Sequence, residues 1–247
     1  YTGVIKYGVV NIKKDDDKVV ISGSFDANDK EKICDYFDLN SDYASIKRKL
    51  ELNDENMKKA IKYGYGIRIL NQDSWEMLIS FIISAANNIP RISKTIENIS
   101  RAYGQKITWN EKGYYKFPTP KELSKATVEE LRALNLGFRD KYVYNATKMV
   151  CAGEVNLEEI EKMNYKDAKK ELMKIQGVGE KVADCILLFS MRKREAFPVD
   201  TWIKKVMSQL YNESKDIKKI SAFAESKFGE YGGIAQQYLF YYMRSNF

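Results

Sequence analysis

The sequence contains no histidine among its 247 residues. Catalysis by a Ser-His-Asp triad or a Cys-His pair is therefore excluded, because both need an imidazole as general base. A histidine-containing zinc site, such as the HExxH motif of metalloproteases or a Cys2His2 finger, is excluded for the same reason. Any general base or nucleophile must be a lysine, aspartate, glutamate, tyrosine, cysteine, serine or threonine.

Cysteine is scarce as well. Cys34, Cys151 and Cys185 lie far apart and form neither a CxxC pair nor the spacing of an iron–sulfur site. An odd number of scattered thiols is typical of a reduced, intracellular protein, so we expect a cytoplasmic location. Lysine outnumbers arginine, and this bias favours an AT-rich prokaryotic source.

Long apolar runs are also missing. The longest mainly apolar stretch, residues 77–86, is about half of the roughly 20 residues that a membrane-spanning helix needs. No signal peptide is visible, so no membrane association is expected. The chain begins at Tyr1 and not at a methionine, which predicts that its natural start lies upstream.

The charged and aromatic residues that are present indicate a class of partner. Lysine and arginine exceed aspartate and glutamate by 41 to 34, and 17 tyrosines accompany 11 phenylalanines and 3 tryptophans. Aromatic rings stack on bases while cations meet phosphates, so this combination favours nucleic acid. The alternative is an ordinary basic surface, because a net charge of +7 is only moderate.

Residues 1–25 carry a β pattern. Clusters of valine and isoleucine alternate with glycines, and an acidic turn at 15–17 separates two of the clusters. This arrangement predicts an antiparallel hairpin or small sheet.

From residue 28 onward the pattern is almost entirely helical. Asp73 and Thr119 are expected helix caps, Pro120 fits a first turn, and Thr127 opens a capping-box pattern. Residues 114–118 are expected to form a loop. Helices are expected at 29–37, 42–52, 55–63, 73–86, 90–103, 119–123, 127–136, 140–151, 156–162, 165–175, 179–191, 200–211, 217–227 and 232–244.

The predicted fold class is α+β and mostly α, with an N-terminal antiparallel sheet followed by a large helical body. We expect three parts: residues 1–70 with the sheet, 71–152 as a helical domain, and 153–247 as a second helical domain.

Residues 172–185, with the sequence LMKIQGVGEKVADC, are the most informative segment. One helix is expected to end at Ile175, and Gly177 and Gly179 permit a tight turn with positive φ. A second helix then begins at once, and the free amides at its N-terminus suit a phosphate. This helix-hairpin-helix unit is a general means of holding the DNA backbone; the alternative is an ordinary glycine-rich turn.

Lys181 lies in the first turn of that second helix. The positive end of a helix dipole disfavours a cation, which favours the neutral, nucleophilic amine. Lys181 is therefore a candidate Schiff-base nucleophile; the alternative is a surface lysine that donates to a phosphate. Asp200 directly precedes another predicted helix, where a carboxylate can cap the helix and also be held in a fixed orientation for catalysis.

Together these residues resemble a known family. The GVG motif at 177–179, followed by Lys181 and then Asp200, resembles the HhH-GPD superfamily of base-excision DNA glycosylases. Within that superfamily, VGEKVADC at 178–185 is most similar to the 8-oxoguanine DNA glycosylase/AP lyase branch. The missing iron–sulfur cysteines argue against the endonuclease III and adenine glycosylase branches. Segments 80–92, 134–139 and 235–240 resemble its DNA-contacting loop, its wedge and its pocket-lining C-terminal helix.

The resemblance implies roles for the catalytic and pocket residues. Lys181 would attack C1′ of the damaged nucleoside, and Asp200 would stabilise the developing oxocarbenium charge. Cys185 and Phe240 would sandwich the flipped base, and Gln236 would meet its Watson–Crick edge. Individually, Cys185 and Phe240 are also compatible with a buried core, and Gln236 with the surface.

The resemblance implies further roles in gripping DNA. Phe138 would wedge into the base stack, Arg91 and Arg139 would hydrogen-bond the orphaned cytosine, and Asn87 and Asn88 would lie in the DNA-contacting loop. For the two arginines, phosphate contacts are the alternative.

The hairpin itself is the implied phosphate-binding element. Gly177, Val178 and Gly179 would contact the DNA backbone, and the carbonyls of Met173, Ile175 and Val178 are candidate ligands for a structural monovalent cation. The resemblance implies no organic cofactor and no catalytic metal.

The predicted function is a bifunctional glycosylase/AP lyase that excises 8-oxoguanine from double-stranded DNA through a lysine Schiff base and β-elimination. We expect a monomer that works on the nucleoid of a bacterial cell. Two alternatives stay open: a glycosylase for another damaged base, and a non-catalytic helix-hairpin-helix module that only binds DNA.

Overall fold

The computed structural model describes residues 1–16 and 18–246, and it confirms an α+β, mostly α fold. The chain forms two compact units. The sheet unit comprises Tyr1–Tyr36, Gln72–Glu159 and Ile175–Gly177, and the helical unit comprises Phe37–Asn71, Ile160–Lys174 and the chain from Val178 onward. The division into three parts at residues 70 and 152 stays a prediction.

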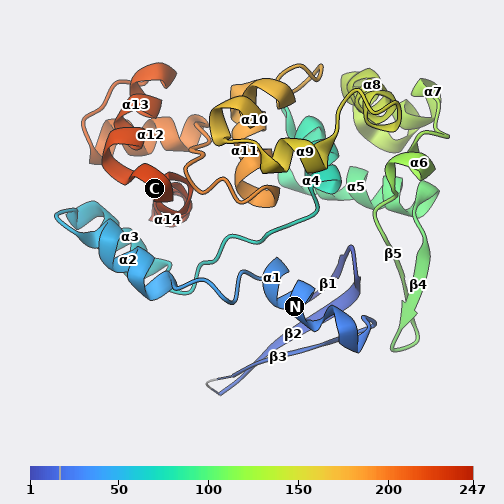
Figure 1. Cartoon of the computed structure of the whole chain (residues 1–247), viewed down its shortest axis with the longest axis horizontal. Coiled ribbons are helices and arrows are strands. Elements are labelled where there is room, and N and C mark those ends of the chain that lie inside the picture. The colour runs from blue at the N-terminus through green and yellow to red at the C-terminus, as the bar shows by residue number, and fades with distance from the viewer. Residues whose placement is uncertain (17, 247) are drawn as a thin grey trace. The chain divides into compact units, whose positions relative to one another are not determined.

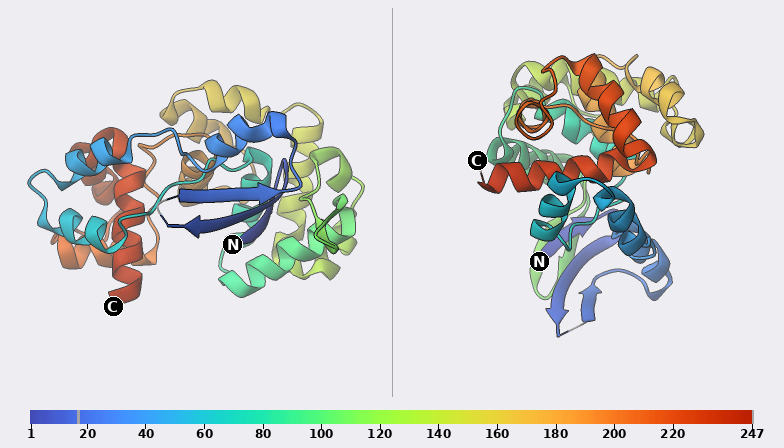
Figure 2. Two further views of the ribbon diagram at one scale, coloured as in Figure 1. Left: turned by 90° about the horizontal axis from the view of Figure 1, so that it is seen from below. Right: turned by 90° about the vertical axis from the view of Figure 1, so that its left-hand side faces the viewer.

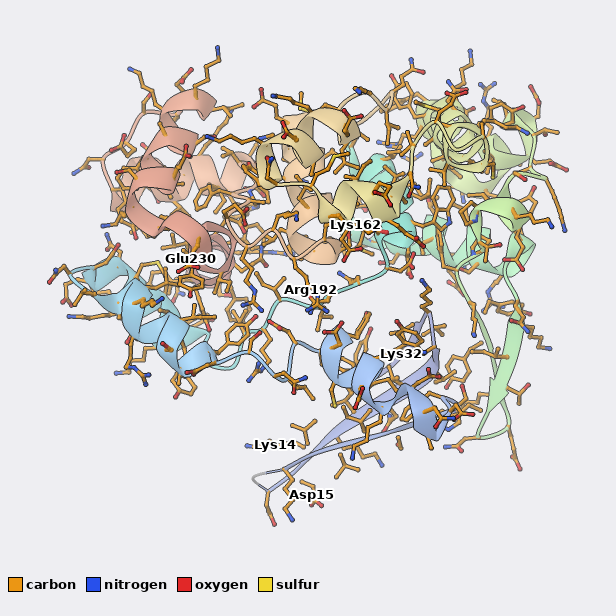
Figure 3. The ribbon with its side chains drawn as sticks, in the orientation of Figure 1. Lys14, Asp15, Lys32, Lys162, Arg192 and Glu230 are labelled. Atoms are coloured by element: carbon orange, nitrogen blue, oxygen red, sulfur yellow. The ribbon has the colours of Figure 1, made fainter. Side chains whose placement is uncertain are left out.

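The sheet unit opens with the expected small antiparallel sheet (Figure 1). Strands β1 (Thr2–Ile5), β2 (Gly8–Asp15) and β3 (Lys18–Gly23) lie in that order, with β2 in the middle, as Figure 2 also shows. Asp15 pairs with Lys18, and Figure 3 labels Lys14 and Asp15 near this end of the hairpin. Asp17, part of the acidic turn expected here, lies outside the described residues.

Helices follow the sheet in this unit, and several begin at the expected caps. Asp73 caps α4, while Thr119 and Thr127 form capping boxes with Glu122 and Glu130. The helical elements are η1 (Ala27–Asp29), α1 (Lys30–Tyr36), α4 (Ser74–Ser84), α5 (Ile89–Tyr103), α6 (Pro120–Leu123), α7 (Val128–Leu131), η2 (Arg132–Leu136), η3 (Gly137–Arg139), α8 (Asp140–Cys151) and the start of α9 (Leu157–Lys162).

A second hairpin in the sheet unit corrects the expectation that the chain is almost entirely helical after residue 28. Strands β4 (Lys106–Trp109) and β5 (Lys112–Tyr115) pair antiparallel (Figure 1). Because β5 includes residues 114 and 115, the loop expected at 114–118 begins two residues later than predicted. Asn110 and Glu111 connect the strands with φ values of 48° and 63°. Glutamate rarely adopts positive φ, so the usual Asn-Gly signal of such a turn is missing from the sequence.

The helical unit is built around its C-terminal helix. Helix α14 (Gly232–Asn246) packs against α3 (Glu55–Tyr63), α12 (Thr201–Leu210) and α13 (Ile217–Phe228). Its remaining elements are α2 (Tyr43–Glu51), the end of α9, α10 (Tyr165–Leu172), α11 (Glu180–Ser190) and η4 (Gly229–Tyr231). The fully buried side chains include Met57, Ile61, Leu172, Ile186, Leu187, Ile203, Val206, Ile220, Tyr238 and Leu239. Among the described residues, no helix is long and apolar enough to cross a membrane.

Candidate functional site

The hairpin expected to bind phosphate has an asymmetric backbone. Helix α10 ends at Leu172, three residues earlier than predicted, and α11 begins at Glu180. Gly177 adopts φ = 93°, and a Cβ on it would lie 3.0 Å from the ring of Tyr142. Gly179 is extended, with φ = −92°, so the positive φ expected in this turn occurs at Gly177 and not at Gly179.

The space next to Gly179 is open. Gly179 caps α11 without a side-chain hydrogen bond, and a Cβ built on it would have no heavy atom within 4 Å. The first-turn amides of α11 therefore face no capping side chain, which suits an incoming anion. Val178 is buried and Met173 is exposed; the cation site at the carbonyls of Met173, Ile175 and Val178 stays a prediction.

Lys181, Cys185 and Asp200 are brought together in the helical unit. Lys181 is half-buried in the first turn of α11, one helical turn before the buried Cys185. Burial raises the pKa of the Cys185 thiol to about 11, although the charge of Lys181 and its hydrogen bond to the sulfur act to lower it. The carboxylates of Asp184 and Asp200 also raise this pKa, which places Asp200 within electrostatic reach of the same sulfur.

Asp200 has the predicted place at a helix N-terminus. Its Oδ1 accepts a hydrogen bond from the Ile203 amide at 2.8 Å and caps α12. The cap fixes the rotamer of a partly exposed carboxylate. Asp200 can therefore present its charge in one direction, which a group that stabilises a cationic sugar requires.

Gln236 is buried, so its alternative assignment to the surface is wrong. Only 3% of the residue is exposed. Its Nε2 donates to the carbonyl of Pro198 at 3.2 Å, and its Oε1 accepts from Nε2 of Gln237 at 2.6 Å. Phe240 lies one helical turn further along α14 and is partly exposed. The amide and the ring thus share one face of α14.

In the sheet unit, the candidate wedge stands out from the surface. Phe138 is 59% exposed. The Arg139 guanidinium lies 4.3 Å from the centroid of its ring, and the Tyr142 ring meets it edge-on at 6.3 Å. Phe138 is therefore held in place at its base, while its outer part is available to a stacked base.

The two candidate opposite-base arginines have different environments. Arg139 is buried and donates hydrogen bonds to the carbonyls of Ala85, Ala86 and Leu136. Burial, with the nearby charge of Arg91, lowers the pKa of Arg139. Arg91 itself is exposed in the first turn of α5. Of the pair, Arg91 is the side chain available to a nucleic-acid base.

The asparagines shape the turn before α5. The Oδ1 of Asn88 accepts from the Arg91 amide at 3.0 Å and caps this helix. Asn87 donates to the carbonyl of Ile83 at 3.0 Å and accepts from the Asn88 amide. Ala86, just before them, has φ = 47°, a strained conformation for alanine. The side-chain amides of Asn87 and Asn88 therefore fix the start of α5 and, with it, the position of Arg91.

Sequence reasoning missed a polar cluster behind α11. Asp184, which is buried, accepts from the Tyr165 hydroxyl at 2.7 Å and from Lys169 Nζ at 2.9 Å, and so joins α11 to α10. Burial raises the pKa of Asp184, and Lys169 acts to lower it. An aspartate inside the apolar run Val182–Leu188 is a signal in the sequence from which this cluster could have been predicted. The contact of Tyr142 with Gly177 has no such signal in the sequence.

A mostly helical body with a glycine hairpin, followed by a lysine and a helix-capping aspartate that both act on one buried thiol, is typical of a DNA-repair protein of the helix-hairpin-helix class. Residues 79–229 match the HhH-GPD superfamily of base excision DNA repair proteins, and residues 1–78 match the N-terminal domain of 8-oxoguanine DNA glycosylase. The chain belongs to the HhH-GPD superfamily, which confirms the resemblance drawn from the sequence.

Similar proteins cover most of the chain. The structure of an 8-oxoguanine glycosylase/lyase from Clostridium acetobutylicum, in complex with double-stranded DNA containing cytosine opposite 8-oxoguanine, is 46% identical with a TM-score of 0.95. That match covers 100% of this chain and 85% of the other. A "Probable N-glycosylase/DNA lyase" of Methanothermobacter thermautotrophicus is 34% identical over 87% of this chain and 75% of its own. The "N-glycosylase/DNA lyase" of Saccharomyces cerevisiae is 35% identical over 71% of this chain and 56% of its own.

Proposed function

We propose that this chain is a bifunctional DNA glycosylase and AP lyase that excises 8-oxoguanine from double-stranded DNA. The observation that carries the proposal is the grouping of three residues in one unit: Lys181 in the first turn of α11, Cys185 one turn further along it, and Asp200 at the N-terminus of α12. The similarity to the glycosylase/lyase of Clostridium acetobutylicum, over the whole chain, supports the choice of lesion.

The chemistry begins with a flipped nucleotide. The Lys181 amine attacks C1′ as the bond from C1′ to the base breaks, and the base leaves with the bonding electrons. Asp200 stabilises the positive charge that develops on the sugar. Ring opening produces an imine between Lys181 and C1′. Loss of a C2′ proton then expels the 3′ phosphate by β-elimination, and water releases the lysine.

Three side chains form the proposed base pocket. Cys185 and Phe240 contact the two faces of the base, and Gln236 hydrogen-bonds its edge. Cys185, whose pKa burial raises from 9.0 to about 11, is a neutral thiol near pH 7, as an ordinary cysteine also is, and does not repel an electron-rich base. The Gln236 amide, already bonded to Pro198, is pre-oriented.

The remaining DNA contacts complete the proposal. Phe138 fills the stack, Arg91 reads the opposite cytosine, and the first-turn amides of α11 bind a phosphate. We propose that the enzyme acts as a monomer on nucleoid DNA in the cytoplasm of a bacterial cell.

Borohydride trapping tests the proposal directly, since it converts a lysine–sugar imine into a stable covalent complex. Wild type should trap on a duplex with 8-oxoguanine opposite cytosine, and Lys181→Gln should not. Lys166→Gln is the matched control, because Lys166 is exposed at the equivalent first-turn position of α10. Equal trapping by wild type and Lys181→Gln would show that another amine reacts.

Additional duplexes separate the alternatives. Trapping or excision with an alkylated base in preference to 8-oxoguanine would indicate a different lesion. Equal binding to damaged and undamaged duplex, without excision, would indicate a module that only binds DNA.

A further inference from the structure

The segment between α11 and α12 carries Asp200 at its end but has no regular structure of its own. Residues 191–200 contain no helix or strand, and Arg192 adopts φ = 55°. The segment nevertheless delivers two functional groups: the Pro198 carbonyl that orients Gln236, and the Asp200 carboxylate. Two internal hydrogen bonds, from the Arg194 amide to the Arg192 carbonyl and from the Ala196 amide to the Lys193 carbonyl, order its first half, and contacts from other elements of the helical unit position the segment as a whole.

One such contact is an ion pair with Asp38. Arg194 Nη2 lies 2.9 Å from both carboxylate oxygens of Asp38, although the two residues are 156 positions apart. The Asp38 side chain is 7% exposed and that of Arg194 is 29% exposed. A pair this sheltered from water is held in one geometry more firmly than a surface pair.

Asp38 is itself fixed from several sides. Its carboxylate also accepts from the Ser41 hydroxyl at 2.6 Å and from the Tyr43 hydroxyl at 2.9 Å. Its backbone carbonyl accepts from Arg68 Nη1 at 2.6 Å. Asp38 adopts φ = 51°, a strained value that these contacts maintain.

The opposite side of the segment rests on the start of α14. The Arg194 carbonyl accepts from the Gly233 amide at 2.7 Å. A Cβ on Gly233 would lie 2.2 Å from Leu188 Cδ1 and 2.6 Å from the Ala196 carbonyl oxygen, so only glycine permits this approach. Arg194 therefore links Asp38, through its side chain, to α14, through its backbone.

We infer that Asp38 and Arg194 are positioning residues that set the placement of Asp200 and Gln236 through the 191–200 segment. The inference rests on the proposed function, since it assigns their effect to base excision. Neither side chain touches the reacting atoms. A displacement of about 1 Å at a catalytic group is enough to slow a reaction by about 100-fold, so loss of the pair should be visible in the chemical step.

The test compares two reactions of the same enzyme. Excision of 8-oxoguanine needs Asp200 and Gln236 in place, whereas trapping at a preformed abasic site needs Lys181 but has no base to release. Arg194→Met and Asp38→Asn should each slow single-turnover excision by about 10- to 100-fold. Borohydride trapping on abasic duplex should change by less than about threefold. Because the amount of trapped complex also measures the fraction of enzyme that is folded, it allows the excision rate to be corrected for partial unfolding.

Two further variants complete the design. Arg194→Lys keeps the charge and should recover part of the excision rate. Lys58→Met removes an exposed ion pair with Glu55 that lies wholly within α3, and excision should be unchanged. Excision and trapping falling in equal proportion, or excision unaffected in both variants, would overturn the inference. Failure of wild type to excise or trap would instead overturn the proposed function.

Discussion

Nε of Arg139 donates a hydrogen bond to the carbonyl oxygen of Ala85 at 2.7 Å, across 54 positions of sequence. The same guanidinium donates to Ala86 at 2.8 Å and to Leu136 at 3.3 Å. One buried side chain thus joins the turn before α5 to the turn that presents Phe138. The Arg139 guanidinium thus hydrogen-bonds backbone carbonyls, whereas the Arg91 side chain is exposed to solvent.

This difference predicts separate effects for two equivalent substitutions. Arg139→Met should lower the free energy of unfolding by about 1–3 kcal/mol, because it removes the donors to the buried carbonyl of Leu136 and to the less buried carbonyls of Ala85 and Ala86. Arg91→Met should change stability by less than about 0.5 kcal/mol, because its side chain is exposed. Urea denaturation measures both. Arg91→Met should also lose the preference for cytosine opposite 8-oxoguanine, measured as single-turnover excision with each of the four opposite bases.

Intact opposite-base preference in Arg91→Met would show that Arg91 does not read the cytosine. A loss of less than about 0.5 kcal/mol in Arg139→Met would show that the carbonyl contacts of Arg139 contribute nothing measurable.

The hairpin glycines should also respond differently to the same change. Gly177→Ala forces a side chain onto φ = 93° and against the Tyr142 ring, so it should cost about 1–3 kcal/mol of stability. Gly179→Ala occupies open space in an extended conformation and should cost less than about 1 kcal/mol. Its methyl group instead meets the incoming phosphate, so DNA affinity should fall about tenfold.

Thermal unfolding and duplex-binding titrations distinguish these effects. A Gly179→Ala variant that binds duplex as tightly as wild type would place the phosphate elsewhere on the hairpin.

Much of the helical body was predictable because its signals are local. Caps such as Asp73, Thr127 and Asp200 depend on residues within one helical turn, and each lies where the sequence predicts it. The sheet at 2–23 was predictable from its valine and isoleucine clusters for the same reason. The β4–β5 hairpin was missed because its turn residue Glu111 adopts a conformation that glutamate seldom takes.

The same distinction between local and long-range signals applies to the candidate site. Lys181 and Asp200 were predictable as residues of a motif, and their position at helix N-termini followed from sequence periodicity. Long-range polar contacts left no local signal: no pattern links Asp38 to Arg194, or Arg139 to Ala85. Such pairs form only when the fold brings distant segments together, so burial in the structure is what identifies them.

Alkaline pH should destabilise the protein through Cys185. Its pKa is raised by burial to about 11 from an ordinary value of 9.0, so the unfolded chain loses the thiol proton first as the pH rises. The stabilisation is complete below pH 9 and is lost as the pH rises through 11, by about 3 kcal/mol in total. Cys185→Ala should show a shallower decline in unfolding free energy from pH 8.5 to 10.5. Parallel curves for wild type and Cys185→Ala would contradict the raised pKa.

Glu76 and Glu122 are each the third residue of their helix, but they should make the stability of the protein depend on pH in opposite directions. Glu76 occupies the third residue of α4, where burial and then the charge of Asp73 raise its pKa from 4.5 to about 7. The folded state therefore keeps a proton that the unfolded chain releases, and this stabilisation, present below pH 4.5, is lost as the pH rises to 7. Glu76→Gln should gain about 1–2 kcal/mol at pH 8 and little at pH 5.

Glu122 is the matched comparison, since it is the third residue of α6. Hydrogen bonds from the Thr119 amide and hydroxyl lower the pKa of Glu122, so its stabilisation is present above the ordinary carboxyl pKa and is lost in acid. Glu122→Gln should therefore lose about 0.3–1 kcal/mol at pH 8. Thermal unfolding of both variants at pH 5 and pH 8 measures the contrast. A Glu76→Gln variant that is less stable than wild type at pH 8 would show that this glutamate is ionised and stabilising in the folded protein, as Glu122 is.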